Sequence, residues 1–372
     1  MCHSPHVSEN PSLLVAGGNQ LCTTCHDDKG ANVTVPHAPV ESDRGCLSCH
    51  SPHAATHDHL LSGEVSDVCF GCHTDVEKQT AELKNIHPPF EERMCTTCHN
   101  PHGSNIDHIL VSRADTLCYG CHAELEDEFR KAYTHPPVLN GLCDTCHHGH
   151  GSNEDKFLKA SGGELCKRCH AELMAETDQG FIHPPFEDGE CLTCHAPHSS
   201  DKRGMLVDKQ STVCFGCHSD LEDDLAEARS KHRPVAEGWC TECHSPHKAA
   251  LEHQLLAASP DLCLGCHQEK KEKMAREKNH PPAARDCLRC HRPHSSGETR
   301  LLAQPLHQLC GDCHDVTKDG FRQAHLGIDP AEIDCVSCHD PHASKDPKFF
   351  KPVEHGPFAA RTCDRCHIVE KE

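Results

Sequence analysis

Short polar stretches rich in helix-forming residues recur along the chain. Four of them are TDVEKQTAELKN (74–85), AELEDEFRKAY (123–133), SDLEDDLAEARSK (219–231) and QEKKEKMAREKN (268–279). Each ends at or near a His-Pro pair, and proline disfavours helical geometry in the residue before it. We therefore predict helices of two to three turns in these stretches, with the charged side chains on solvated faces.

The segments between these stretches show no alternation of apolar and polar positions of the kind that indicates a β-strand. They carry a Pro-His pair, a serine and a pair of leucines, and are interpreted as turns and coil. No apolar run approaches the roughly 20 residues of a membrane span, and no signal peptide is visible. The predicted fold is mostly irregular and α-helical, with little or no β-structure.

The composition leaves little material for a conventional core. Hydrophobic residues make up 36% of the 372 residues and aromatic residues only 4%, with a single tryptophan, Trp239. Such a composition is typical of disorder, unless a group other than side chains fills the interior. The formal net charge of −21 argues against nucleic acid, which needs a basic surface, and favours solubility and cationic partners.

The 31 cysteines follow one pattern. Thirty of them form C-x-x-C pairs: Cys22 and Cys25, Cys46 and Cys49, Cys69 and Cys72, Cys95 and Cys98, Cys118 and Cys121, Cys143 and Cys146, Cys166 and Cys169, Cys191 and Cys194, Cys214 and Cys217, Cys240 and Cys243, Cys263 and Cys266, Cys287 and Cys290, Cys310 and Cys313, Cys335 and Cys338, Cys363 and Cys366. A histidine follows each pair directly: His26, His50, His73, His99, His122, His147, His170, His195, His218, His244, His267, His291, His314, His339 and His367.

C-x-x-C-H is the attachment signature of c-type haem. The two thiols form thioethers with the vinyl groups of one haem, and the imidazole that follows binds its iron. We therefore predict haem c as the cofactor, with fifteen complete sites. The haems would also supply the apolar core that the polypeptide lacks.

Structural zinc is the main alternative, because C-x-x-C pairs separated by about 15–20 residues are also a zinc signature. Nineteen residues separate Cys49 from Cys69. Zinc sites do not require a histidine after every second cysteine, so haem explains more of the pattern. Disulfides within the C-x-x-C pairs would explain neither the histidines nor the thin core.

The motifs alternate between two kinds. A first-kind motif reads H-P-P-F, about eight residues, then C-x-x-C-H-x-P-H-x-S, as in HPPFEERMCTTCHNPHGS from His87. A second-kind motif has L/V-C-x-x-C-H before an acidic stretch, as in LCYGCHAELEDEF from Leu117. The interval from a first-kind cysteine to the next second-kind cysteine is always 23 residues, and the return interval is 24 to 26. The constant interval indicates a rigid two-haem unit, and the variable one indicates a linker.

The whole repeat of about 48 residues predicts an elongated molecule in which each unit contacts mainly its neighbours. Cys2 and His3 match the second half of a first-kind motif, so we expect a sixteenth haem site that is truncated there, with any export signal upstream. The predicted units are a truncated first repeat (1–36), two-haem repeats (37–86, 87–134, 135–182, 183–231, 232–279 and 280–324) and an atypical two-haem cap (325–372).

The second axial ligand of each iron is expected to be histidine, because the five methionines stand at irregular places. One set, the upstream histidines, precedes the first-kind motifs: His37, His87, His135, His183, His232, His280, His325 and His355. A second set, the downstream histidines, follows them in C-H-x-P-H: His53, His102, His150, His198, His247, His294 and His342, with His6 beside the truncated motif.

Matching these sets by number assigns the upstream histidines to first-kind haems and the downstream histidines to second-kind haems. Either the preceding or the following second-kind haem is open to a downstream histidine, and the count favours the preceding one because the other choice leaves His342 without a haem. The alternative for the downstream set is that Pro-His only shapes a turn. Six other histidines show no shared register and are expected in solvent or at haem propionates: His57, His59, His108, His148, His253 and His307.

The alternating pattern CTTCHNPHGS…LCYGCHAEL spans essentially the whole chain and resembles the paired C-x-x-C-H repeat of multihaem c-type cytochromes from metal-respiring bacteria. The upstream histidines also resemble the distal ligands of small tetrahaem class III cytochromes. The resemblance implies low-potential bis-His haems that carry electrons in the bacterial periplasm or at the cell surface. Other redox proteins or extracellular electron acceptors would be the partners.

We therefore expect an electron-transfer wire and not an enzyme, because a six-coordinate iron has no open position for a substrate. A multihaem reductase is one alternative, although the altered C-x-x-C-K motif of such enzymes does not occur here. A subunit that self-assembles into a conducting filament is another. Attachment of c-type haem needs reduced thiols after export, which favours the periplasm or the cell exterior.

Overall fold

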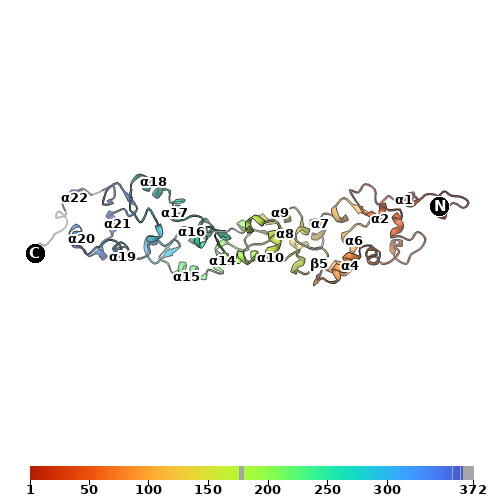
Figure 1. Ribbon diagram of the computed structural model, residues 1–372, viewed down its shortest axis with the longest axis horizontal. Helices are drawn as coiled ribbons and strands as arrows, with labels where there is room; N and C mark the ends of the chain where they lie inside the picture. Colours follow the sequence, from red (N-terminus) through yellow and green to blue (C-terminus); the bar gives the residue numbers. More distant parts are fainter. Residues whose placement is uncertain (176–179, 354, 361, 363–372) are drawn as a thin grey trace. The chain divides into compact units, whose positions relative to one another are not determined.

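The computed structural model describes residues 1–175, 180–353, 355–360 and 362. The chain divides into two units, of which the first contains Met1–Ala175 and Gly189–Val207, and the second contains the remaining described residues. Within each unit, short helices and two-residue strands are joined by loops (Figure 1). The fold is mostly irregular and α-helical with little β-structure, which confirms the predicted fold class.

Two groups of helices flank the second-kind motifs. The helices of the first group each end one residue after the first cysteine of the motif: α1 (Gly18–Thr23), α3 (Val65–Phe70), α7 (Ala114–Tyr119), α10 (Gly162–Lys167), α14 (Gln210–Phe215), α17 (Asp261–Leu264) and α19 (Leu306–Gly311). The second group follows the motif: α4 (Thr74–Ala81), α8 (Glu124–Phe129), α11 (Ala171–Met174), α15 (Ser219–Glu227), α18 (Gln268–Arg276) and α20 (Asp319–Ala324).

The four polar stretches form α4, α8, α15 and α18, so the predicted helices are confirmed. Each helix ends three or four residues earlier than the pattern predicts. The reason is that a short strand occupies the position before the upstream histidine, as Asn85–Ile86 does before His87.

Two further groups belong to the first-kind motifs. One begins directly after an upstream histidine, with proline in its first turn, where the missing N–H is harmless: α2 (Ala38–Glu41), α5 (Pro88–Glu91), α9 (Pro136–Leu139), α12 (Pro184–Glu187), α16 (Arg233–Ala236) and α22 (Gly356–Ala359). The other is a single turn on the C-x-x-C pair: α6 (Cys95–Cys98), α13 (Cys191–Cys194), α21 (Cys335–Cys338), and the 3₁₀ turns η2 (Gly45–Ser48), η5 (Cys143–Thr145), η8 (Cys240–Glu242) and η10 (Cys287–Arg289).

A 3₁₀ turn follows most first-kind motifs at a constant distance: η1 (Pro11–Leu13), η3 (Asp58–Leu60), η4 (Asp107–Ile109), η6 (Asp155–Phe157), η7 (Arg203–Met205), η9 (Glu252–Gln254) and η11 (Thr299–Leu301). One more, η12 (Pro330–Glu332), precedes α21. Residues at the centre of the recurring turns adopt left-handed backbone angles, as His59 does with φ of 58°.

The strands form two-stranded antiparallel sheets between segments far apart in the sequence. They are β1 (Val35–Pro36) with β3 (Gly103–Ser104), β2 (Asn85–Ile86) with β5 (Gly151–Ser152), β4 (Tyr133–Thr134) with β7 (Ser199–Ser200), β6 (Phe181–Ile182) with β9 (Lys248–Ala249), β8 (Ser230–Lys231) with β11 (Ser295–Ser296), and β10 (Lys278–Asn279) with β12 (Ala343–Ser344). In each sheet, the strand before an upstream histidine pairs with the strand after a downstream histidine one repeat further on.

The polypeptide buries almost no apolar side chains of its own. Among the described residues, Leu225 and Ala343 are the only buried hydrophobic ones, and the other buried side chains are serines and a threonine. This confirms that a side-chain core is thin. The residues that recur instead in the middle of each repeat are the cysteines and histidines of the motifs.

Candidate functional site

Each C-x-x-C-H motif is one tight turn of backbone. The amides of His50 and Cys49 both donate to the carbonyl of Cys46, at 3.0 and 3.3 Å. The bond from the histidine amide recurs in the other complete motifs that the structure describes. Residues three and four positions apart share one face of such a turn. The local fold therefore gathers two thiols and one imidazole, as attachment of a single haem requires.

Thiols of successive motifs lie against one another. In the first unit, hydrogen bonds join Cys22 to Cys46, Cys69 to Cys95, Cys118 to Cys143, and Cys166 to Cys191. In the second unit, they join Cys214 to Cys240, Cys263 to Cys287, and Cys310 to Cys335. The second cysteines approach across the other interval, as Cys49 and Cys72 do. Within each unit the motifs thus form one continuous row.

The hydrogen-bonded thiol contacts span the variable intervals of 24 to 26 residues, where the spacing predicts a linker. The constant interval of 23 residues is also spanned, by second cysteines such as Cys49 and Cys72. The boundaries predicted for the individual repeats stay a prediction.

The hydrogen bond between paired thiols raises the pKa of one thiol in some pairs and lowers it in others. Burial and the neighbouring Cys95 raise the pKa of the Cys69 thiol to about 11. The hydrogen bond with Cys214 instead lowers the pKa of Cys240 to about 7, although burial opposes this. The paired thiols therefore differ in how readily they form the thiolate, which is the nucleophilic form of cysteine.

The upstream histidines face the motif histidines of second-kind motifs. Their rings are nearly parallel, at 12–20°, with centroids 6.0–6.4 Å apart. The pairs are His37 with His73, His87 with His122, His135 with His170, His183 with His218, His232 with His267, and His280 with His314. The members of each pair lie 34–36 residues apart in the sequence.

The downstream histidines face the motif histidines of the preceding first-kind motifs, with ring centroids 5.9–6.2 Å apart. The pairs are His53 with His3, His102 with His50, His150 with His99, His198 with His147, His294 with His244, and His342 with His291. These partners are 50–52 residues apart.

This pairing differs from the one that the motif counts predict, because the two sets of histidines exchange roles. A downstream histidine lies only three residues after its own motif histidine, so it reaches a neighbouring motif. The neighbour is the preceding first-kind motif and not a second-kind motif. The antiparallel sheets explain this: the amide of His87 donates to the carbonyl of His150 at 3.0 Å, which joins two histidines that face different motifs.

Each first-kind motif histidine is oriented by a backbone carbonyl nine residues further on. The Nδ1 atom of His50 lies 2.8 Å from the carbonyl oxygen of His59, and the same contact, at 2.7–3.1 Å, recurs at every first-kind motif the structure describes. Donation from Nδ1 leaves Nε2 free to bind a metal. The 3₁₀ turns supply this contact. In each of them the carbonyl belongs to a residue with left-handed backbone angles, as at His59.

His59, His108 and His253 occupy this position, where the backbone carbonyl accepts the hydrogen bond, so the prediction that they share no register is wrong. The position was missed because its side chain varies: Lys156, Gly204 and Arg300 are found there in other repeats. A search for a constant interval from the motif histidine, regardless of residue type, would have found it.

The C-H-x-P-H-x-S sequence supplies more than the downstream histidine. The carbonyl oxygen of Pro101 lies 2.7 Å from Nδ1 of His37. In later repeats, the carbonyls of Pro197, Pro293 and Pro341 accept a hydrogen bond from an upstream histidine in the same way. The serine holds the turn that follows, since Ser200 donates its hydroxyl to the carbonyl of Leu206 at 2.6 Å. Proline and serine were predicted only as turn residues.

Burial favours the neutral imidazole, which is the form that binds a metal. Burial lowers the pKa of five downstream histidines: His102, His150, His198, His294 and His342. It also lowers the pKa of three upstream histidines: His135, His232 and His280.

The facing imidazoles fit a haem iron between them. A bond of about 2.0–2.1 Å from each Nε2 to the metal, with each ring centroid about 1.1 Å beyond its nitrogen, separates the centroids by about 6.2 Å. The observed separations of 5.9–6.4 Å agree. By contrast, no cluster of three or more His, Cys, Asp or Glu side chains within the described ranges could hold a metal ion on its own, as structural zinc would need.

Two predicted ligands pack on phenylalanine rings: His325 on Phe321 with ring centroids 4.1 Å apart, and His339 on Phe350 at 4.7 Å. His195 keeps the Nδ1 contact of a first-kind motif histidine, to the carbonyl of Gly204, and His247 contacts Phe186. Within the part of the chain that the structure describes, no imidazole is seen facing His6, His26 or His355. The last motif, with Cys363, Cys366 and His367, lies outside the described residues.

A protein family described as the doubled CXXCH motif matches eight segments, which together make up most of the chain: 1–31, 37–78, 87–127, 135–175, 183–223, 232–272, 280–319 and 329–353. The chain belongs to the doubled CXXCH family. Membership means that it is a multihaem c-type cytochrome with covalently bound haem, and that its general function is electron transfer. No curated protein matches it.

Multihaem cytochromes of the doubled CXXCH family exchange electrons with redox partners and are typically exported proteins. In the described ranges, every helix is too short or too polar to span a membrane.

Proposed function

We propose that the chain is an electron carrier in which histidines bind each haem iron on both faces, and that it works in respiratory electron transfer in the periplasm or at the cell exterior. The fifteen complete C-x-x-C-H motifs would hold fifteen haems, with Cys2 and His3 as half of a sixteenth site. The first ligand is the motif histidine. The second is an upstream histidine for second-kind haems and a downstream histidine for first-kind haems.

One observation carries this proposal. Twelve histidine pairs, six of each type, place two imidazole rings at the separation that an iron atom between them requires. One member of such a pair is held at Nδ1 by a backbone carbonyl, as His37 is by Pro101 and His50 is by His59, so its Nε2 is available. Imidazoles brought together only by turn chemistry would have no reason to repeat this spacing.

The row of thiols supports transfer along the chain. When bound, haem supplies a metal centre that takes up and releases one electron. The protein anchors successive centres through cysteines that touch, such as Cys69 and Cys95, so that no polypeptide layer separates them. Aromatic rings cover the distal histidines from the side, as Phe129 does for His198 at 4.0 Å, and exclude water.

Ligation on both faces leaves no coordination position for a substrate, and for this reason we propose a carrier and not a reductase. The redox partners would be other redox proteins or extracellular electron acceptors. The net charge of −21 favours partners with a cationic surface.

The test is to remove one second ligand from haem-loaded protein made in a host that attaches c-type haem. His102→Ala should convert one haem per chain from low-spin to high-spin in the ferric EPR spectrum, and added imidazole should restore it. His108→Asn is the matched control, because this exposed histidine contributes only its backbone carbonyl and asparagine tolerates a left-handed backbone. It should leave all haems low-spin.

Two results would contradict the proposal. Zinc in place of haem would exclude the cofactor, and an unchanged spectrum of His102→Ala would exclude the ligand pair. A high-spin haem in the unmodified protein would instead show an open coordination position and favour the multihaem reductase.

A further inference from the structure

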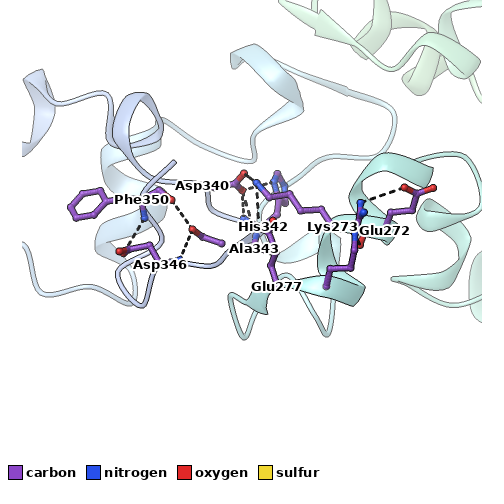
Figure 2. A network of polar contacts seen from close by, with 10 residues as sticks. Glu272, Lys273, Glu277, Asp340, His342, Ala343, Asp346 and Phe350 are labelled. Atoms are coloured by element: carbon purple, nitrogen blue, oxygen red, sulfur yellow. Dashed lines mark hydrogen bonds and ion pairs between the residues drawn. The ribbon is translucent and has the colours of Figure 1, made fainter. Parts of the chain in front are cut away.

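An ion pair stands beside one of the downstream histidines. Nζ of Lys273, on α18, donates to Oδ2 of Asp340, two residues before His342 (Figure 2). The two side chains are only 27% and 14% exposed. In the lysine and arginine ion pairs elsewhere in the described residues, the basic side chain is at least 46% exposed. Glu277 also approaches Lys273, at 3.8 Å.

Asp340 is turned toward His342. Its Oδ1 accepts the backbone amide of His342 at 3.0 Å and lies 3.6 Å from Nδ1 of the same residue. The imidazole of His342 faces His291 with centroids 6.1 Å apart and ring planes 10° apart. The carboxylate therefore lies on the Nδ1 side of the ring, away from the iron site between the two histidines.

The carboxylate occurs at this position in one repeat only. The residues that take its place in the other C-H-x-P-H sequences are Ser4, Ser51, Asn100, His148, Ala196, Ser245 and Arg292. Asn100 makes the same turn, since its Oδ1 accepts the amide of His102 at 3.1 Å. A neutral oxygen acceptor is enough for this turn, so the turn does not require the negative charge of Asp340.

We propose that Asp340 and Lys273 set the reduction potential of the haem held between His291 and His342. This inference rests on the proposed bis-His ligation. A negative charge at Nδ1 makes the imidazole a stronger donor and favours the ferric iron, which carries one more positive charge than the ferrous iron. Lys273 offsets part of that charge, and Lys270 adds to the positive field at His342. The partial burial of the pair limits screening by water.

The two partners must then act with opposite sign. Asp340→Asn leaves Lys273 without its counter-charge and should raise the potential of this haem. Lys273→Gln leaves the carboxylate uncompensated and should lower it. Because asparagine already serves in this turn at position 100, Asp340→Asn preserves the hydrogen bond to the amide of His342.

The experiment is a potentiometric titration of the haem-loaded proteins at pH 7, followed by absorbance and by the low-spin EPR signals. The expected result is a shift in the midpoint potential of one haem. The potential should rise for Asp340→Asn and fall for Lys273→Gln. Glu272→Gln is the control. It removes an equal charge from an exposed position on the same helix, paired with Arg276, and should leave the titration unchanged.

The outcomes separate this inference from the function on which it rests. If both variants keep full haem content and only low-spin signals but titrate like the unmodified protein, the inference is wrong and the ligation stands. Shifts of the same sign would also overturn it, because a merely structural role would disturb the site in one direction. Absence of low-spin haem signals from the unmodified protein would refute the bis-His ligation itself.

Discussion

Two histidine pairs have almost the same geometry but lie beside helices of opposite charge. In the first unit, His147 and His198 face each other at 6.0 Å beside α8, which carries four acidic residues and no basic one. In the second unit, His291 and His342 face each other at 6.1 Å beside α18, with Lys270, Lys271, Lys273 and Arg276 against two glutamates.

The contacts behind this difference are specific. Phe129, the last residue of α8, stacks on His198 at 4.0 Å, and the hydroxyl of Ser199 donates to the carbonyl of Glu128 at 2.6 Å. Burial lowers the pKa of His198 while Glu128 opposes that shift. At His342, burial and Lys270 both lower the pKa, and Asp340 opposes them. The repeat thus supplies the geometry, and the helix that covers it supplies the electric field.

The strongest test of the shared geometry is removal of the second ligand in both regions. We expect His198→Ala and His342→Ala each to convert one haem per chain to the high-spin state, because among the described residues no second imidazole pairs with His147 or His291. Ferric EPR and near-infrared spectra measure the change. A low-spin spectrum in only one of the variants would show that the two pairs are not equivalent.

The left-handed turns allow a second comparison. Lys156 and Arg300, with φ of 57° and 59°, provide the carbonyls for His147 and His291. Glycine at either position should raise the free energy of unfolding by about 0.5–1 kcal/mol, since it removes a left-handed penalty of about 1–2 kcal/mol at some cost in chain entropy. Chemical denaturation measures this.

Gly204 provides the reverse control for those turns. It holds the same position in another repeat, with φ of 72°. Gly204→Ala should lower the free energy of unfolding by about 1 kcal/mol. Equal gains for Lys156→Gly and Arg300→Gly would support a common strained turn, and a loss in either would contradict it.

The charges of the two helices should shift potentials in opposite directions. Glu128→Gln removes a negative charge near His198 and should raise the potential of that haem. Lys270→Gln removes a positive charge near His342 and should lower the potential there. Both side chains are exposed, so the shifts should be small and should shrink as salt is added. Potentiometric titration at low and high ionic strength checks both, and shifts independent of salt would contradict an electrostatic origin.

A further expected effect concerns acid. Although burial alone would raise it, the pKa of Asp340 is lowered from 3.8 to about 2 by Lys273 and by the backbone amides of His342 and Ala343. A lowered pKa stabilises the fold above the unfolded value, and this contribution disappears as pH falls from about 4 to about 2. The stability difference between the unmodified protein and Asp340→Asn should therefore vanish over that range in acid denaturation.

Ala196 takes the place of Asp340 beside His198, so the first region offers the contrast. Ala196→Asp places a carboxylate there without a lysine partner on α8 and should gain no comparable stability at neutral pH. An equal gain would show that the backbone amides alone, and not Lys273, hold the charge.

The sequence was sufficient for the features that are local. The C-x-x-C-H turns, the helices of the polar stretches and the shortage of apolar side chains follow from residues within a few positions of one another. The two sets of candidate ligands were also recognisable, because His37 and His53 recur in register with the motifs.

What could not be predicted depends on long-range contacts. The partner of His102 lies 52 residues before it, and the strands that position it have two residues each, too few for an alternating pattern. Counting motifs therefore gives a different pairing of the histidines from the one in which their rings face each other. The carbonyl at His59 was missed for another reason, since a backbone group leaves no constant side chain in the sequence.

The interleaved strands bear on how such a chain can change in length over evolution. Each repeat has one strand that pairs with the following repeat and one that pairs with the preceding repeat. The pairs Val35 with Ser104 and Asn85 with Ser152 show the same register one repeat apart. A tandem duplication of a whole repeat inside the array would recreate every such bond, whereas an insertion of any other length would break several. Gene duplication can therefore extend the row of haem-attachment motifs without redesigning a single contact.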